Sequence, residues 1–358
     1  MKVKIGDLTK IKTGKLDANA STEDGQYPFF TCSKEPLKIS TYSYDCECVL
    51  VAGNGDLNVK YYNGKFDAYQ RTYIIEDNGS GKLYMPYLYY FMEGYIEELR
   101  KQAIGGVIKY IKLGNLTEAL IELPSVDEQK SIVEILEKAK GILDKRNDEI
   151  CALNDLIKAR FVEMFENGTY QTEKLGTVCA KITDGTHKTP TYLDEGITFI
   201  SAKNIVNGEL DFSDIKYISE KEYQEIQNRC QTAIYDILLS KSGSLGAPVI
   251  VKTEEKLGLF ESLAVLKYDR EKLLPEFLCE QLKIDRIQRQ FTIGTKGVAV
   301  KHLHLGVIAD TDVIVPPMDE QEQFAKFVKQ INKSKVAVQK ALDETQLLFD
   351  SLMQKYFG

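Results

Sequence analysis

Several residue types are scarce in this 358-residue chain. It has no tryptophan, only three histidines, and no C-x-x-C pair among its seven cysteines. An odd, scattered set of cysteines with so few histidines argues against a structural zinc site and against a disulfide framework. We therefore expect reduced thiols and no bound metal. The cysteines are Cys32, Cys46, Cys48, Cys151, Cys179, Cys230 and Cys279.

Long apolar runs are also missing. No stretch approaches the roughly 18 apolar residues of a membrane span. Residues 1–7 lack the apolar core of a signal peptide. These absences predict a soluble cytoplasmic protein that does not contact a membrane.

Common catalytic motifs are absent as well. Gly14-Lys15 is followed by Leu16 rather than completing a phosphate-binding loop, and there is no G-x-S-x-G, no H-E-x-x-H and no amino-methyltransferase motif. His302 and His304 would share one face of a strand, but no third metal ligand lies near them in the sequence. We expect no catalytic residues and no metal ligands in this chain.

Positive charge is not concentrated anywhere. The chain carries 46 basic and 53 acidic residues, a net charge of −7, without a basic tail. A nucleic-acid-binding face would therefore have to be a local patch, or depend on a basic partner protein.

The most informative feature that is present is a repeat. Residues 123–129 recur as residues 315–321, and the register continues without a gap to the C-terminus. An apolar series at alternating steps of four and three follows each copy, as in a coiled-coil seam. Because the two seams match, we expect the helices to pair antiparallel through Leu136, Leu143, Ile150, Leu153, Ile157, Val328, Ile331, Val338, Leu342 and Phe349.

The repeat divides the chain into four parts. These are a first β-rich block (1–123), a long helix (124–165), a second β-rich block (166–315) and a second long helix (316–358). Ser125 and Glu128 fit a capping box at the start of the first helix, and Pro317 starts the second. The fold class that follows is α+β, with two pseudo-symmetric α/β domains joined by an antiparallel coiled coil.

The two blocks are more loosely alike than the helices. Residues 4–8 resemble 174–178, and residues 27–31 fall where 197–201 do. Runs such as 48–51, 72–75 and 264–266 predict strands, and residues 85–101 and 275–291 each predict one helix late in a block. The blocks therefore look like diverged copies of one domain.

Loops that mix cations, amides and aromatic residues occur in both blocks, residues 60–63 among them. Arginine and lysine read guanine edges, asparagine and glutamine read adenine, and hydroxyl groups hold phosphates. Any single loop could equally be an ordinary solvated turn, but their number on a duplicated frame favours DNA binding. The candidate residues are Ser33, Lys34, Asn54, Lys60, Tyr61, Tyr69, Gln70, Arg71, Lys109, Lys112, Thr186, His187, Lys188, Lys203, Asn204, Lys241, Ser242, Lys296, Lys301 and His302.

Two variable domains, each followed by a P-x-x-D-E-Q helix, resemble the specificity subunit of type I restriction–modification systems. Residues 106–112, 184–190 and 316–321 carry the resemblance, which covers essentially the whole chain; Ser125 stands where the family usually has a second proline. The resemblance implies two target recognition domains, each reading one half of a split sequence in double-stranded DNA. It implies that the two helices act as a spacer and a docking surface.

The resemblance also implies partners. Two modification subunits would bind S-adenosylmethionine and methylate adenine, and restriction subunits would use ATP, so this chain would hold no cofactor itself. The main alternative is a duplicated, non-enzymatic adaptor whose domains bind protein. A fused DNA-modifying enzyme is a third possibility, which the missing catalytic motifs oppose.

Overall fold

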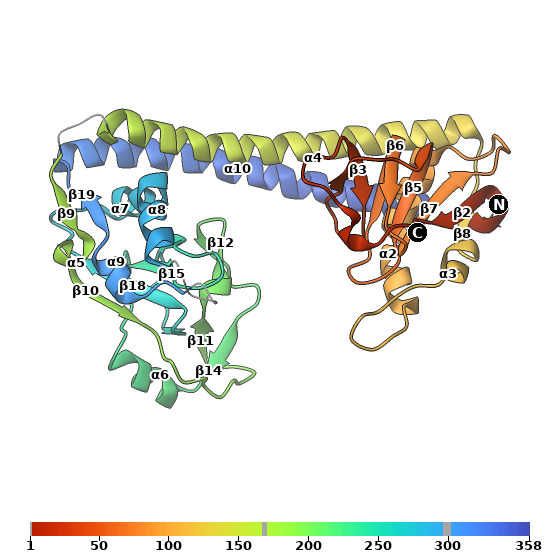
Figure 1. Ribbon diagram of the computed structural model, residues 1–358. Helices are drawn as coiled ribbons and strands as arrows, with labels where there is room; N and C mark the ends of the chain where they lie inside the picture. The colour runs from red at the N-terminus through yellow and green to blue at the C-terminus, as the bar shows by residue number, and fades with distance from the viewer. Residues whose placement is uncertain (1, 167–169, 296–301) are drawn as a thin grey trace. The chain divides into compact units, whose positions relative to one another are not determined.

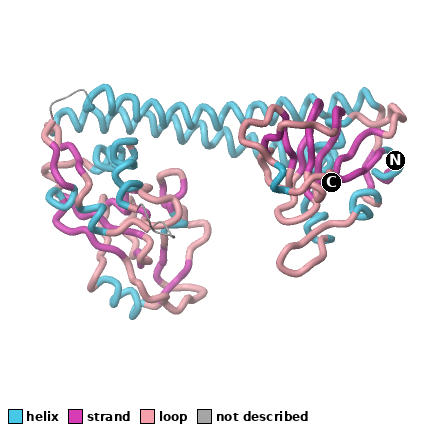
Figure 2. The backbone as a smooth tube through the Cα atoms, in the orientation of Figure 1, coloured by secondary structure: helices cyan, strands magenta, loops and turns pink. Residues whose placement is uncertain are grey.

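The computed structural model describes residues 2–166, 170–295 and 302–358, and the chain divides into two compact units (Figures 1 and 2). Unit 1 consists of Met1–Asn147 and Gln339–Gly358, and unit 2 of Asp148–Val338. Each unit combines a mixed β-sheet domain with segments of both long helices, so the expected α+β class is confirmed.

Unit 1 is built around a six-stranded sheet in the order β2-β7-β5-β6-β3-β4, with β3 and β6 parallel and the other pairs antiparallel. A separate pair, β1 and β8, joins the two ends of the domain. The elements before the first long helix are β1 (Lys2–Lys4), α1 (Ile5–Leu8), β2 (Thr9–Thr13), a 3-10 turn (Ala18–Ala20), β3 (Tyr27–Phe30), β4 (Leu37–Ile39), β5 (Tyr44–Ala52), β6 (Val59–Ala68), β7 (Thr72–Asp77), α2 (Met85–Gln102), α3 (Leu113–Thr117) and β8 (Leu120–Glu122).

Unit 2 is built around two smaller sheets, β10-β18-β15-β16 and β14-β11-β17, with a further pair formed by β12 and β13. A pair formed by β9 and β19 takes the place of β1 and β8. The elements between the long helices are β9 (Thr172–Lys174), α5 (Leu175–Val178), β10 (Cys179–Asp184), β11 (Ile197–Ile200), a 3-10 turn (Ala202–Asn204), β12 (Ile205–Val206), β13 (Glu209–Leu210), β14 (Lys216–Ile218), α6 (Glu220–Gln227), β15 (Ile237–Ser240), β16 (Pro248–Ile250), β17 (Leu257–Leu259), β18 (Leu263–Tyr268), α7 (Pro275–Lys283), α8 (Asp285–Gly294), α9 (Leu305–Ala309) and β19 (Asp312–Ile314).

The two sheets differ chiefly at one strand. In unit 1 the single strand β6 pairs with β5 along one part and with β3 at its end. In unit 2 these two roles fall to separate strands, because β16 pairs with β15 and β17 runs parallel to β11. The predicted likeness of residues 4–8 to 174–178, and of 27–31 to 197–201, is confirmed by their equivalent places in the two domains.

The long helices are α4 (Val126–Phe161) and α10 (Met318–Phe357). Glu128 N donates to Ser125 Oγ at 3.3 Å, and Ser125 N donates to the Glu128 carboxylate at 2.9 Å, which confirms the capping box. At the start of α10 the carbonyl oxygen of Pro317 accepts the N–H groups of Glu320 and Gln321. Both helices therefore begin where the sequence predicted.

Within each unit the two helices run antiparallel. In unit 1 Val133 and Leu136 of α4 share a core with Phe349 and Leu352 near the end of α10. In unit 2 Ile157, near the end of α4, shares a core with Val328 near the start of α10. Of the ten seam residues named above, six are buried and four, Ile150, Leu153, Leu342 and Phe349, are half-buried.

Aromatic side chains attach each domain to its helices. In unit 2 the Phe161 and Phe165 rings lie 5.5 and 5.0 Å from the Phe277 ring of α7. In unit 1 the Phe357 ring of α10 lies 5.1 Å from the Tyr87 ring of α2. Such pairs stabilise by about 0.5–1.5 kcal/mol beyond the burial of their area, so each domain is held firmly on its own part of the helix pair.

Three sequence predictions about elements need correction. Residues 275–291 form two helices, because Ile284 is extended (φ −71°, ψ 151°) between α7 and α8. The first long helix is α-helical only as far as Phe161, and residues Val162–Glu166 form a π-helical turn at its end. His302 and His304 lie in no strand; their rings contact each other instead at 5.6 Å.

Candidate nucleic-acid interface

The predicted loops of unit 1 converge beyond one end of the central sheet strands. Gly53 N donates to Arg71 O, Ile111 N donates to Gly53 O, and Gly55 N donates to Lys109 O, at 2.8 to 3.0 Å. The side chain of Asn58 donates to Cys32 O at 2.8 Å. These bonds gather the loops around residues 31–34, 53–55, 69–71 and 109–112 into one surface.

The predicted loops of unit 2 converge in the same way. Lys241 N donates to Ser262 O and Leu303 N donates to Lys241 O, both at 2.8 Å. Ala202 N donates to Ser262 Oγ at 3.0 Å. The loops around residues 185–190, 201–204, 241–244 and 260–262 therefore meet, together with residues 302–303.

Four backbone hydrogen bonds of the first surface have counterparts in the second. Gly53 N to Arg71 O matches Lys241 N to Ser262 O, and Ile111 N to Gly53 O matches Leu303 N to Lys241 O. Two further bonds of unit 1, Tyr69 N to Phe30 O and Gln70 N to Leu16 O, are matched by Phe260 N to Ile200 O and Glu261 N to Thr186 O. Divergent sequences thus fold into one shared arrangement of loops.

In each surface a glycine lies at a crossing point, where two backbone segments pass very close to each other. A Cβ atom on Gly14 would lie 2.1 Å from Ala68 O, and one on Gly185 would lie 2.1 Å from Leu259 O. Both contacts are with backbone atoms, so no other residue fits without moving the neighbouring strand. The two glycines fix the close approach that places the loops side by side.

In unit 1 most predicted contact residues are accessible. Asn54, Lys60 and Tyr69 are half-buried, whereas the others are exposed: Ser33, Lys34, Tyr61, Gln70, Arg71, Lys109 and Lys112. Among the residues that the structure describes, Arg71 has no side-chain hydrogen bond or ion pair, so its guanidinium is available to a ligand. Gln70 donates to Asp17 Oδ1 at 2.9 Å.

Lys60 and Tyr61 were predicted to lie in a loop, but they lie in strand β6. Successive strand residues face opposite sides of the sheet. Burial lowers the pKa of Lys60, whose ammonium lies near Cys32 and Glu35 and so borders the loop surface. Tyr61 instead contacts Tyr89 of α2, with ring centroids 6.4 Å apart, and donates to Glu47 at 2.7 Å. Tyr61 therefore lies apart from the loops.

In unit 2 the placement is more varied. His187, Lys188 and Lys203 are exposed, and Thr186, Ser242 and His302 are half-buried. Lys203 forms a 2.7 Å ion pair with Asp214, which is also exposed. The predicted contacts Lys296 and Lys301 lie outside the residues that the structure describes.

Two predicted contacts of unit 2 are buried, which corrects their expected exposure. Asn204 is 3% exposed, and its side chain bonds to the backbone of Ser201, Asp211 and Asp214. Lys241 is 2% exposed, and its ammonium pairs with Asp184 at 2.5 Å. Both side chains are fully occupied within the protein and hold loops rather than face solvent.

Burial opposes ionisation of Asp184, but hydrogen bonds from Lys241 and Arg229 outweigh it and hold the pKa of this carboxyl below its usual value. His187 Nε2 lies 3.2 Å from the same carboxylate. Asp184, Arg229 and Glu261 were not among the predicted contact residues, although residues 184–190 were predicted as a loop. The carboxylates Asp184 and Glu261 were left out because a carboxylate is an unfavourable neighbour for DNA phosphates. The Asp184-Gly185 dipeptide, at the crossing point, was the available signal.

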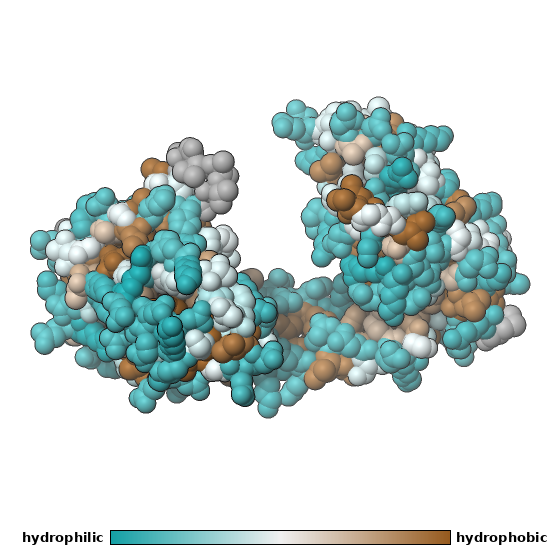
Figure 3. Space-filling view, turned by 90° about the horizontal axis from the view of Figure 1, so that it is seen from below, coloured by the Kyte–Doolittle hydropathy of each residue, from teal (hydrophilic) through white to brown (hydrophobic). Residues whose placement is uncertain are grey.

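A shallow groove of about 690 Å³ opens among the unit 2 loops. Its lining combines polar residues with apolar ones: Ser201, Lys203, Asn207, Ser242, Ser244, Glu261 and Ser262 are polar, and Ala202, Ile205, Val206 and Phe260 are apolar. On the faces that Figure 3 shows, hydrophilic residues predominate and hydrophobic ones form only small groups. The groove can therefore make both hydrogen bonds and apolar contacts with a ligand.

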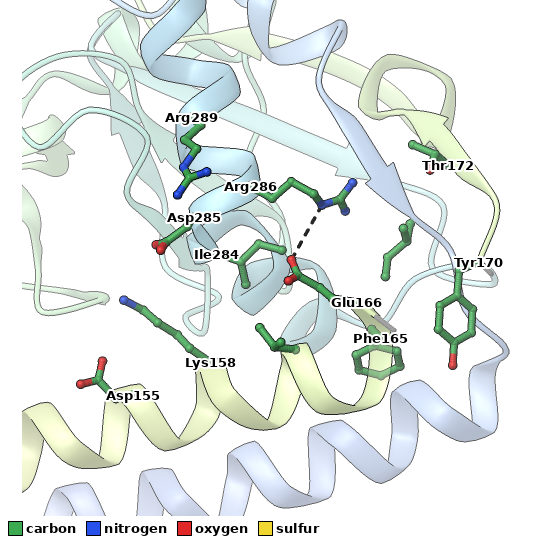
Figure 4. A pocket seen from close by; sticks show the side chains of 12 residues that line it. Asp155, Lys158, Phe165, Glu166, Tyr170, Thr172, Ile284, Asp285, Arg286 and Arg289 are labelled. Carbon is green, nitrogen blue, oxygen red and sulfur yellow. Dashed lines mark ion pairs between the residues drawn. The ribbon is translucent and has the colours of Figure 1, made fainter. Parts of the chain in front are cut away.

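Another hollow of unit 2, about 740 Å³, lies between the end of α4 and α8 (Figure 4). Three cations, Lys158, Arg286 and Arg289, share its lining with the carboxylates Asp155, Glu166 and Asp285. The Nε atom of Arg286 lies 3.9 Å from Glu166 Oε1. Because the charges balance, this hollow does not select an anion.

The residues that the structure describes hold neither a metal site nor a membrane span. No cluster of three or more His, Cys, Asp or Glu side chains there could hold a metal ion. No helix in that part of the chain is both long and apolar enough to cross a membrane.

The fold and the loops define a class: a duplicated protein in which each half presents a polar loop surface on a domain fixed to a shared helix pair. The family model described as "Type I restriction modification DNA specificity domain" matches residues 1–152 and 167–345. The chain belongs to this family, and the two matched segments fall on the two copies of the domain.

Known specificity subunits are similar to this chain in sequence. The specificity subunit of the type I restriction enzyme EcoDI from Escherichia coli is 44% identical over 135 residues, which are 38% of this chain and 30% of that subunit. The EcoBI specificity subunit of the same species is 22% identical over 347 residues, covering 87% of this chain and 73% of that subunit. The chain thus spans under a third of the length of the first relative and nearly three quarters of the second.

A solved structure shares the whole fold. The crystal structure of the S subunit of a type I restriction-modification system from M. genitalium covers 100% of this chain and 96% of its own, with a TM-score of 0.54 and 17% identity. A structure titled for complex assembly and conformational transition of the type I R-M system gives the same TM-score at 16% identity.

Proposed function

We propose that this chain gives a type I restriction–modification complex its DNA sequence specificity, with each domain reading one half of a bipartite target. The observation that carries the proposal is the matched loop surface in the two domains, built by corresponding hydrogen bonds on unlike sequences. A shared frame with divergent loops is what two different half-sites on one duplex require.

The loops divide between two tasks. Phosphate contacts position a protein on DNA, and side-chain contacts to base edges read the sequence. In unit 1 the exposed Arg71 and Gln70 suit base edges, while Lys34, Lys109 and Lys112 suit phosphates. In unit 2 Lys188 and the hydroxyl groups of the groove would contact base edges and phosphates. A pseudo-symmetric protein of this kind would read half-sites about one helical turn, ~34 Å, apart, with the helices setting the spacer.

The partners complete the proposal. Because this chain carries a net charge of −7, we assign most phosphate neutralisation to basic partner subunits. Two modification subunits would dock on the helices, bind S-adenosylmethionine and methylate adenine, and restriction subunits would use ATP. The chain itself would hold no cofactor and perform no catalysis, and the complex would act in the cytoplasm.

The test is to assemble the chain with modification subunits and sequence the methylated sites on random DNA. Two conserved half-sites separated by a spacer of fixed length are expected. Replacing residues 1–123 by the corresponding block of another specificity subunit should change one half-site and leave the other half-site and the spacer alone. Methylation without a bipartite pattern, or turnover by this chain alone, would contradict the proposal and favour the adaptor or the fused enzyme.

A further inference from the structure

Lys241 occupies an unusual position for a lysine in a loop surface. Its side chain is 3% exposed, and its Nζ atom lies 2.5 Å from Asp184 Oδ2, whose side chain is also 3% exposed. The same Nζ donates to the carbonyl oxygen of Glu261 at 3.0 Å and lies 3.7 Å from the Glu261 carboxylate. One ammonium group therefore ties the segment before Gly185 to the segment around Glu261.

The backbone of Lys241 makes further ties. Its N–H donates to Ser262 O and its carbonyl accepts from Leu303 N, both at 2.8 Å. Asp184 in turn accepts from Arg229, and its carboxylate lies 3.2 Å from His187 Nε2. The network thus joins five segments, those at residues 184–187, 229, 241, 261–262 and 303. It borders the groove, because Glu261 and Ser262 belong to both and Ser242 follows Lys241.

Among the residues of the first domain that the structure describes, no such network forms at the equivalent position. Gly53 stands at the position of Lys241 and makes the same two backbone bonds, to Arg71 O and from Ile111 N. A Cβ atom there would lie 2.3 Å from Arg71 O, so no side chain fits. Thr13, before Gly14, stands where Asp184 does before Gly185. The two domains therefore hold equivalent loops by different means.

We propose that Lys241 and Asp184 are positioning residues that pre-organise the reading loops of the second domain, while the first domain needs no counterpart. The proposal rests on the function proposed above and deepens it. A buried pair of this kind is a poor source of net stability, because desolvation offsets the attraction between its charges. Its value lies in fixing geometry: with both charges satisfied, residues 185–188 and 260–262 keep one arrangement relative to each other.

The experiment compares three variants of the full chain. Lys241→Met leaves Asp184 buried without its lysine and should lower the melting temperature. Asp184→Asn/Lys241→Met removes both charges and should recover much of that loss, because Arg229 and His187 are more than half exposed and can turn to water. The matched control is Asp236→Asn/Lys267→Met, which removes a 2.6 Å pair with a buried carboxylate elsewhere in the same domain.

Two readouts separate positioning from stability. Amide hydrogen exchange of the free chain should rise about tenfold or more in residues 185–188 and 260–262 of the double variant, and not in the control. In the complex with modification subunits, the double variant should methylate sites relaxed in the second half-site only, at unchanged spacer length. The first half-site serves as an internal reference.

The proposal fails if the recovered double variant shows wild-type exchange in these loops and wild-type reading of both half-sites. It also fails if the control variant loosens the same loops. A wild-type complex that lacks bipartite specificity would instead contradict the proposed function. The hydrogen-exchange data would still decide whether the Lys241–Asp184 pair positions the loops.

Discussion

Gln129 and Gln321, 192 residues apart, make the same three hydrogen bonds. Gln129 Oε1 accepts from Tyr84 N, and its Nε2 donates to Lys82 O and Pro124 O. Gln321 Oε1 accepts from Leu274 N, and its Nε2 donates to Lys272 O and Pro316 O. In each copy the glutamine of the repeated Asp-Glu-Gln segment is therefore a clamp. It bonds the start of its long helix to the segment just before that helix and to the start of a helix in the domain.

The first prediction concerns this clamp. Gln129→Met or Gln321→Met keeps the side-chain size but leaves a backbone N–H and two carbonyl groups without partners, so each should cost about 1–3 kcal/mol. Urea unfolding measures the loss. Gln323→Met, at an exposed position two residues away, is the control and should change little. Wild-type stability in both clamp variants would show that water replaces the bonds at no cost.

The helix seam gives the second prediction. Leu136 is fully buried, so Leu136→Asp should cost about 3–5 kcal/mol, as an unpaired buried charge does. Ile150→Asp and Leu342→Asp should cost less, because both side chains are half-buried. The adjacent Ile135 is 41% exposed, and Ile135→Asp should stay within about 0.5 kcal/mol of wild type. An equal loss at residues 135 and 136 would refute the seam.

Arg71 gives the third prediction. If its free guanidinium reads a guanine, Arg71→Ala should cost about 1–3 kcal/mol and relax one position of one half-site. If it contacts only phosphate, affinity should fall evenly across sequences and the salt slope should shrink by about one. The control is Lys10→Ala. Lys10 is also an exposed cation, but in the sheet it pairs with Glu76, near the end of β7 that lies away from Arg71. Relaxation of both half-sites together would overturn the assignment of one half-site to each domain.

The fourth prediction concerns pH. The folded-state pKa of Asp184 lies below its usual value of 3.8, so its ionisation stabilises the fold above that pH. This contribution is lost as the pH falls from about 4 through the lower pKa of the folded protein. Between neutral pH and pH 3 the urea midpoint of wild type should therefore fall further than that of Asp184→Asn/Lys241→Met. An equal fall in both proteins would show that this carboxylate is not stabilised by folding.

The long helices were predictable because their apolar spacing repeats over some forty residues, and spacing is a local property of the sequence. The break at Ile284 was not, since neither proline nor glycine marks it. There Gln281 bonds to both the N–H and the carbonyl of Ile314, at 2.8 and 3.0 Å. A contact with a segment 33 residues away takes the place of a local stop signal.

The loop surface was predictable as a set but not residue by residue. Lysine is seldom fully buried, so Lys241 was expected to face solvent. Its partner Asp184 lies 57 residues earlier, and no local pattern links the two. The prediction for Tyr61 was wrong for a similar reason. The polar and aromatic residues around it are typical of a turn, and only pairing with β5 and β3, which are distant in sequence, makes this segment a strand.

Strand β6 has a consequence for insertions. Its ten residues pair continuously with β5 and then with β3, so one residue added near Asn63 would turn every later side chain to the wrong face of the sheet. In the second domain residues 251–256 interrupt the corresponding path between β16 and β17. Length changes there stay within a connection and leave both pairings in register. The second domain can therefore gain or lose residues at a point where the first domain must keep its length.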